Sequence, residues 1–132
     1  MRTFNPVVLL VLLVAQSASA QAADLSGAWT VSGAACDTVF TKENDKPVFK
    51  PDADLHAGGL IVRGNQITGT FQKCAVKSLH NDGSNMQVIA SCSDGVAVSE
   101  VAYDVKFSGE DKMTLSSEKP VPVSMSYVRC SM

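Results

Sequence analysis

The chain has 132 residues, of which 45% are hydrophobic and 18% are charged. This length supports one domain, and the hydrophobic content excludes a disordered chain. The formal net charge of −2 excludes the strongly basic surface that is typical of nucleic-acid-binding proteins, so we expect no nucleic-acid partner.

The first 20 residues predict a secretory signal peptide. Arg2 supplies a positive charge, an unbroken apolar run covers 7–15, and Ala18-Ser19-Ala20 has the small residues of a cleavage site. As a helix this run measures only about 14 Å, too short for a hydrocarbon core of about 30 Å, although a retained anchor is the alternative. Cleavage after Ala22 fits the same pattern. We expect one exported domain over 21–132, periplasmic or secreted, with no membrane segment.

Apolar and polar residues alternate with a period of two through the mature part, which predicts β-strands. Residues 42–58 are the least regular and are interpreted largely as loop. About eight short strands with turns between them predict an all-β domain, and we expect an antiparallel up-and-down barrel. The expected strands lie near 26–33, 36–41, 46–50, 58–63, 66–76, 84–92, 96–108, 112–117 and 121–130.

All four cysteines lie in the exported part, so two disulfides are expected. Their wide spacing is unlike the close cysteine pairs of a zinc site. In a hairpin that turns at 82–84, Cys74 lies directly opposite Cys92, within reach of a disulfide. This favours a second bridge from Cys36 to Cys130, which would make the first and last strands neighbours. The other two pairings remain alternatives.

Gly27-Ala28-Trp29 opens the first expected strand, and Arg129 lies near the end of the last. Arg129 shares the inward face of that strand with Tyr127. The pattern resembles the lipocalin-like, or calycin, barrels, in which the Trp closes one barrel end and a late Arg packs across its ring. The resemblance implies that Gly27, Trp29 and Arg129 close the barrel, whereas an ordinary core Trp and a surface Arg are the alternative.

The stretch 24–37, DLSGAWTVSGAACD, resembles the opening of the bacterial periplasmic inhibitors of secreted alkaline zinc metalloproteases. Those inhibitors are small exported eight-stranded barrels whose segment before the first strand enters the protease cleft. They have one disulfide early in the chain, whereas Cys36 has no possible partner before Cys74. The resemblance implies an inhibitory segment made of Gln21, Ala22, Ala23, Asp24 and Leu25.

The expected inward faces contain several Met and aromatic residues. They would either line an adaptable apolar pocket with hydroxyl groups to orient a ligand, or fill the interior of an eight-stranded barrel. Both alternatives stay open. The candidate pocket residues are Met86, Tyr103, Phe107, Met113, Met125 and Tyr127.

No motif indicates catalysis, a metal or a cofactor. Asp52, Asp54 and His56 alternate and would share one face of an extended chain, but no fourth ligand lies nearby, so a solvated loop is expected. His80 is interpreted as a polar turn residue. We therefore expect no enzyme activity, although a site assembled from distant residues is an alternative.

Together these patterns predict an exported, monomeric β-barrel that acts by binding. A secreted protease, bound through the N-terminal segment, is the first expected partner. The alternative is a carrier that holds a small apolar ligand in the barrel interior.

Overall fold

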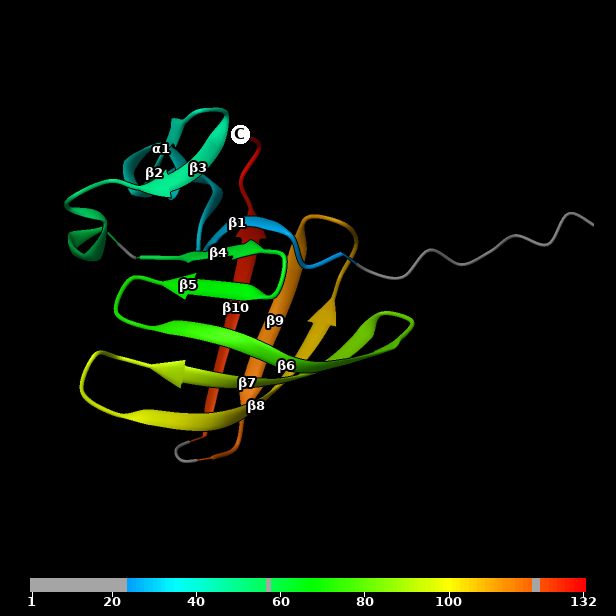
Figure 1. The fold of residues 1–132 in the computed structure, drawn as a ribbon. Coiled ribbons are helices and arrows are strands. Elements are labelled where there is room, and N and C mark those ends of the chain that lie inside the picture. Colours follow the sequence, from blue (N-terminus) through cyan, green and yellow to red (C-terminus); the bar gives the residue numbers. More distant parts are fainter. Residues whose placement is uncertain (1–23, 57, 120–121) are drawn as a thin grey trace, which may run out of the picture.

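The computed structural model describes residues 24–56, 58–119 and 122–132 (Figure 1). The predicted signal peptide lies outside these residues. Ten strands are described: β1 (Gly27–Thr30), β2 (Phe40–Glu43), β3 (Lys46–Phe49), β4 (Leu60–Arg63), β5 (Gln66–Gly69), β6 (Lys73–Asp82), β7 (Asn85–Ser93), β8 (Val98–Phe107), β9 (Lys112–Ser117) and β10 (Val123–Arg129). The helical elements are short: η1 (Gly33–Ala35) and η2 (Ala53–Leu55) are 3₁₀ turns, and α1 (Cys36–Val39) is an α-helix.

Eight strands form a closed antiparallel barrel in the order β1-β10-β9-β8-β7-β6-β5-β4. From β4 to β10 each strand pairs with the next one along the chain. β1 then closes the barrel, because Trp29 is paired with Arg129 of β10 on one side and with Leu60 of β4 on the other. The predicted fold class and the predicted contact between the first and last strands are confirmed.

The alternation in the sequence explains why these strands close around a core. On β8, Val101 and Val105 are buried while Ala102 and Asp104 are exposed. Each large apolar side chain that leaves water contributes about 1.5–3 kcal/mol, so the inward faces are the main source of stability. The buried core residues are Leu25, Trp29, Val62, Ile67, Cys74, Met86, Val88, Ala90, Cys92, Val101, Val105, Met113 and Tyr127.

Between β1 and β4 the chain leaves the barrel and forms a small outer layer over 31–59, at the upper left of Figure 1. The strand expected near 46–50 is confirmed as β3, whereas the expected loop over 42–58 is wrong in part, because β2 and β3 form a hairpin there. Asn44 and Asp45 make its two-residue turn with φ angles of 51° and 63°, a conformation that these two residue types tolerate.

The outer layer explains two apolar residues that face out of the barrel. Ala28 of β1 and Ile61 of β4 are buried beneath it in a second cluster, with Val39, Phe40 and Ala53. The expected strand over 36–41 is also wrong in part, because its first four residues are α1. A helix of four residues is too short to produce a helical period in the sequence.

Two further expectations are corrected on β5 and β6. The strand expected over 66–76 is two strands, separated by a turn after Gly69. β6 continues to Asp82 through a bulge between Val76 and Ser78. His80 therefore lies in β6, opposite Gln87, and not in a turn.

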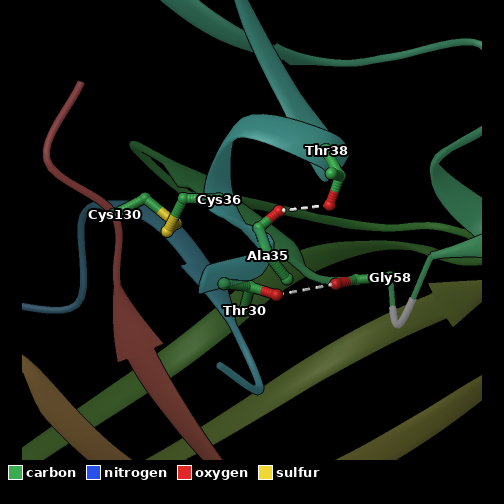
Figure 2. Close-up of a disulfide and its surroundings, with 6 residues drawn as sticks. All are labelled: Thr30, Ala35, Cys36, Thr38, Gly58 and Cys130. Carbon is green, nitrogen blue, oxygen red and sulfur yellow. Dashed lines mark hydrogen bonds between the residues drawn. A yellow bond between two sulfur atoms is a disulfide. The ribbon is translucent and has the colours of Figure 1, made fainter. Parts of the chain in front are cut away.

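Both disulfides have the favoured pairing, Cys36–Cys130 and Cys74–Cys92, with Cα–Cα distances of 5.7 and 4.0 Å. Figure 2 shows the first bridge, which joins the start of α1 to the residue after β10. Beside it, the Thr30 hydroxyl donates to the carbonyl of Gly58 at 3.1 Å and ties the two ends of the outer layer together (Figure 2). Two disulfides indicate an oxidising, extracellular-type environment.

None of the helices in the described part of the chain is long and apolar enough to span a membrane.

Candidate functional site

The barrel has two different ends, because successive turns of an antiparallel barrel alternate between them. The β4–β5, β6–β7 and β8–β9 turns lie with residues 24–26 at one end, which we call the closed end. The β5–β6, β7–β8 and β9–β10 connections lie at the other end, which we call the mouth.

Trp29 seals the closed end. Its side chain is 0% exposed, and its indole N–H donates to the carbonyl of Leu25 at 2.9 Å. The guanidinium carbon of Arg129 lies 4.2 Å from the centre of the indole ring, and the ring of Phe107 lies 6.3 Å away. This is the contact between Trp29 and Arg129 that the resemblance implies, and a cation over a Trp face contributes about 0.5–2 kcal/mol.

Arg129 also fixes the chain that leads into β1. Its Nη2 donates to the carbonyl of Asp24 at 2.7 Å, and its Nη1 donates to the carbonyl of Ser26. Its Nε donates to the carbonyl of Glu110 at 3.1 Å, and the Asp111 carboxylate lies 3.7 Å from the same nitrogen. Sequence reasoning missed Glu110 and Ser26, because contacts through backbone carbonyls leave no side-chain signal.

Asp24 is the most N-terminal residue of this hydrogen-bonded group at the closed end. Its carboxylate accepts the backbone N–H of Ser26 at 2.9 Å, and this bond holds the pKa of Asp24 below its usual value. The positive charge of Arg129 lowers that pKa further. The carbonyl groups of three consecutive residues, 24 to 26, are thus all hydrogen-bonded to Arg129 or Trp29.

The structure divides the predicted inhibitory segment. Gln21, Ala22 and Ala23 lie outside the described residues. Asp24 is exposed, whereas Leu25 is only 6% exposed and belongs to the barrel core. A buried side chain cannot also enter a protease cleft, so Leu25 acts as part of the seal, and Asp24 is the exposed residue in the described part of this segment.

The six candidate pocket residues are spread along the barrel axis. Phe107, Met113 and Tyr127 form one row across β8, β9 and β10, on the row next to the closed end. The next row towards the mouth runs Met86, Val105, Leu115 and Met125, by the pairing of β7 to β10. Tyr103 is opposite Val88 one row further towards the mouth.

The exposure of this set changes along the axis. Met86, Met113 and Tyr127 are buried, and Phe107 and Tyr103 pack against the core. Met125 is 41% exposed although it faces inward. The row next to the closed end is therefore core. On β10 the exposure increases towards the mouth, whereas Val88 and Ala90 of β7 and Val101 of β8 stay buried there.

The outer face of β6 to β9 carries a polar row in register, His80, Gln87, Asp104 and Ser116. It is part of a hollow of about 410 Å³. His80 and Ser116 are the outermost members of this row, three strands apart. The Ser116 hydroxyl donates to the backbone carbonyl of Asp104 at 3.4 Å, so this row does not have the Ser–His–Asp contacts of a hydrolase.

The carboxylates of the 52–56 stretch do not assemble a metal site. Asp52 lies 3.3 Å from His56 in an exposed pair. In the ranges that the structure describes, no three His, Cys, Asp or Glu side chains are grouped closely enough to hold a metal ion.

No protein-family model, no curated protein and no solved structure matches this chain.

Proposed function

We propose that this chain is an exported β-barrel binding protein that inhibits a secreted protease through the residues before Leu25. The supporting sequence observation is the resemblance of 24–37 to the opening of the periplasmic inhibitors of alkaline zinc metalloproteases. The supporting structural observation is the hydrogen bonding of Asp24, Leu25 and Ser26 at the closed end.

This anchoring matters for binding because ordering a flexible segment opposes association. The segment leaves the barrel at Asp24 from a fixed point, since Arg129 and Trp29 hold the carbonyl groups of the next residues. A segment that is fixed at its base loses less conformational freedom when it enters a cleft, and binds more tightly for the same contacts. The two disulfides suit a protein that works among proteases outside the cytoplasm.

The test uses the mature chain, 21–132, and an alkaline zinc metalloprotease. We expect inhibition by the mature chain, and deletion of Gln21–Asp24 should raise the inhibition constant by at least about thirtyfold, the effect of losing one strong interface contact. Val96→Ser, in the β7–β8 turn at the mouth, is the control and should leave the constant unchanged. No inhibition by the mature chain, or equal inhibition after the deletion, would show that the proposal is wrong.

A further inference from the structure

The first half of β8 has a partner strand on one side only. β8 pairs with β7 from Val98 to Lys106, whereas its pairing with β9 covers Asp104 to Phe107. Among the described residues, none forms a backbone hydrogen bond with 98–102 on the side away from β7. These five residues, which span about 17 Å, are therefore an open strand edge next to the mouth.

Hydrogen bonds at the other end of β8 determine which backbone groups face this edge. The N–H of Phe107 donates to the carbonyl of Ser84, just before β7, at 2.8 Å, and the N–H of Ser108 donates to the carbonyl of Lys112 of β9 at 2.9 Å. Backbone groups alternate between the two neighbouring strands, so odd-numbered residues of β8 bond to β7 and even-numbered residues point the other way. Three residues thus direct their N–H and C=O groups to the open edge: Val98, Glu100 and Ala102.

This edge does not have the features that usually prevent an exposed strand from pairing. Natural proteins place prolines, lysines or bulges at such edges. The stretch 98–103, VSEVAY, contains neither proline nor lysine, and its pairing with β7 has no register shift. By contrast, β3, at an edge of the two-stranded outer sheet, contains Pro47, whose carbonyl accepts a hydrogen bond from Arg63 at 3.1 Å. The edge of β8 is therefore suited to accept another strand.

The charges beside the edge favour a basic partner. A hollow of about 360 Å³ on the outer side of β7 and β8 borders the edge, and residues 118 and 119 after β9 contribute to its lining. Its charged residues are three carboxylates, Glu100, Asp104 and Glu118, and one ammonium group, Lys119. Lys77 reaches Glu100 at 3.4 Å in an exposed ion pair, so one negative charge remains in excess.

An added strand would direct alternate side chains to the two faces of the sheet. On the outer face they would lie over the carboxylates of the hollow, where lysine or arginine fits. On the inner face they would extend the apolar row of Val101, which is 6% exposed, where an aliphatic side chain fits. A second copy of β8 would bring the same carboxylates to the edge, and like charges on facing strands are destabilising.

We propose that the open edge of β8 binds an extended segment of a partner protein in which basic and aliphatic residues alternate. The segment adds to the sheet as an antiparallel strand, like every neighbouring pair in the barrel. Main-chain hydrogen bonds to Val98, Glu100 and Ala102 supply affinity, and the acidic hollow selects the basic side chains. This site lies towards the opposite end of the barrel from residues 21–25 and goes beyond the proposed protease inhibition.

The first experiment adds a capped seven-residue peptide of alternating lysine and valine to the mature chain and follows amide hydrogen exchange by NMR. In the free chain the amides of Glu100 and Ala102 should exchange quickly, whereas those of Val101 and Tyr103, which bond to β7, should be protected. Saturating peptide should slow exchange at Glu100 and Ala102 by at least about tenfold. Unchanged exchange at both amides up to millimolar peptide would overturn the proposal.

The second experiment tests the backbone bonds. In an antiparallel pair, the residue opposite Glu100 shares its face of the sheet and exchanges main-chain bonds with it. N-methylation of the lysines should therefore weaken binding by at least about tenfold, because it removes donors to β8 and keeps the charge. N-methylation of the valines, whose N–H groups point away from β8, is the matched control. Equal binding of the two N-methylated peptides would contradict strand addition.

The third experiment tests the charges. Glu100→Lys combined with Glu118→Lys should weaken binding of the lysine–valine peptide by at least about fivefold. Glu43→Lys combined with Glu110→Lys makes the same change in net charge at exposed positions elsewhere and should leave binding unchanged. Protection of the Val101 amide shows that the variants are folded. Equal binding by both double variants would overturn the selection of basic segments.

Two further outcomes separate this proposal from its alternatives. Protection of the Glu100 and Ala102 amides that rises with protein concentration, without peptide, would show that a second copy occupies the edge and would overturn the proposal. Deletion of Gln21–Asp24 should leave peptide binding unchanged, so this proposal and the protease proposal fail independently.

Discussion

Arg129 combines several interactions in a single side chain. It covers the ring of Trp29, binds the carbonyl groups of Asp24 and Ser26, and reaches the β8–β9 turn through Glu110. A lysine would retain the charge but not the planar set of donors that makes these contacts together. The closed end therefore depends on guanidinium geometry as well as on charge.

Arg129→Met should lower the free energy of unfolding by about 2–4 kcal/mol, because it removes a cation–π contact and charge-assisted hydrogen bonds. Urea denaturation followed by the fluorescence of Trp29 measures this change. Lys77→Met is the control, since Lys77 forms an exposed ion pair with Glu100 at 3.4 Å, and such a pair should contribute less than about 1 kcal/mol. Equal effects of the two substitutions would contradict the role given to Arg129.

Asp24 predicts a pH dependence at the same end. Its pKa is lower in the folded chain than its ordinary value of 3.8, because the ionised carboxylate accepts the N–H of Ser26. The stability that it contributes is therefore present above about pH 3.8 and is lost as the pH falls through the folded value. Wild type should be more stable than Asp24→Asn at pH 6, and the difference should shrink below pH 4. A difference in urea midpoint that stays constant from pH 6 to pH 2.5 would be inconsistent with this assignment.

At the scale of elements, the outer layer over 31–59 packs against the barrel at one close backbone contact. A Cβ on Gly59 would lie 2.4 Å from the backbone oxygen of Trp29 and 2.7 Å from the ring of Phe40. Neither neighbour can move freely, because Trp29 is in the barrel wall and Phe40 is in the second core cluster. Gly59 thus sets the distance between the layer and the barrel.

Gly59→Ala should destabilise the protein by roughly 1–3 kcal/mol or more, which is the usual cost of overpacking a tight site. The comparison is Gly64→Ala, where the added Cβ meets no atom within 4 Å and the cost comes from the positive φ of 58° alone. Urea denaturation of both variants, with hydrogen exchange of the amides in β2 and β3, tests this. The amides of the outer layer should lose protection in Gly59→Ala and keep it in Gly64→Ala.

At the scale of the whole molecule, the two disulfides constrain very different lengths of chain. Cys36–Cys130 spans 94 residues and joins the outer layer to the end of β10, whereas Cys74–Cys92 spans 18 residues within one hairpin. In the chain-entropy model a longer closed loop removes more freedom from the unfolded state. The long bridge is therefore expected to contribute more to stability.

Replacing Cys36 and Cys130 together by Ala should lower the free energy of unfolding by about 4–5 kcal/mol. Replacing Cys74 and Cys92 together by Val should lower it by about 3 kcal/mol. Val is chosen for the second pair because both of its sulfur atoms are in the packed core, where a cavity would add its own cost. The urea midpoints give the comparison, and a larger loss for the short bridge would contradict the entropic argument. Cys36→Ser alone should leave one reactive thiol, on Cys130.

The barrel could be predicted because its signals are local. The alternation on β8 and the turn at Gly83 define strands and a hairpin from neighbouring residues alone. The register of that hairpin then places Cys74 opposite Cys92 and leaves Cys36 for Cys130. The order of charge, apolar run and small residues at the start of the chain likewise predicts export, and the two disulfides indicate an oxidising environment.

The outer layer could be predicted only in part, since the strand expected near 46–50 is β3 but the hairpin that it forms with β2 was missed. Whether 42–58 is loop or hairpin depends on the burial of Phe40 and Phe49 against a distant strand, and the polar residues between them hide this. The 41% exposure of Met125 could not be predicted either, because its alternation with Tyr127 along β10 predicts a covered side chain.

The sequence by itself determined the strand periodicity and the disulfide register, because both follow from period and spacing along the chain, and the resemblance to the calycin barrels implied the contact between Trp29 and Arg129. Only the tertiary structure decided that Leu25 is part of the seal and that Met125 and Val123 of β10 are partly exposed. Burial and convergence of side chains depend on which strands meet across the barrel, and strands distant in sequence meet only when the barrel closes.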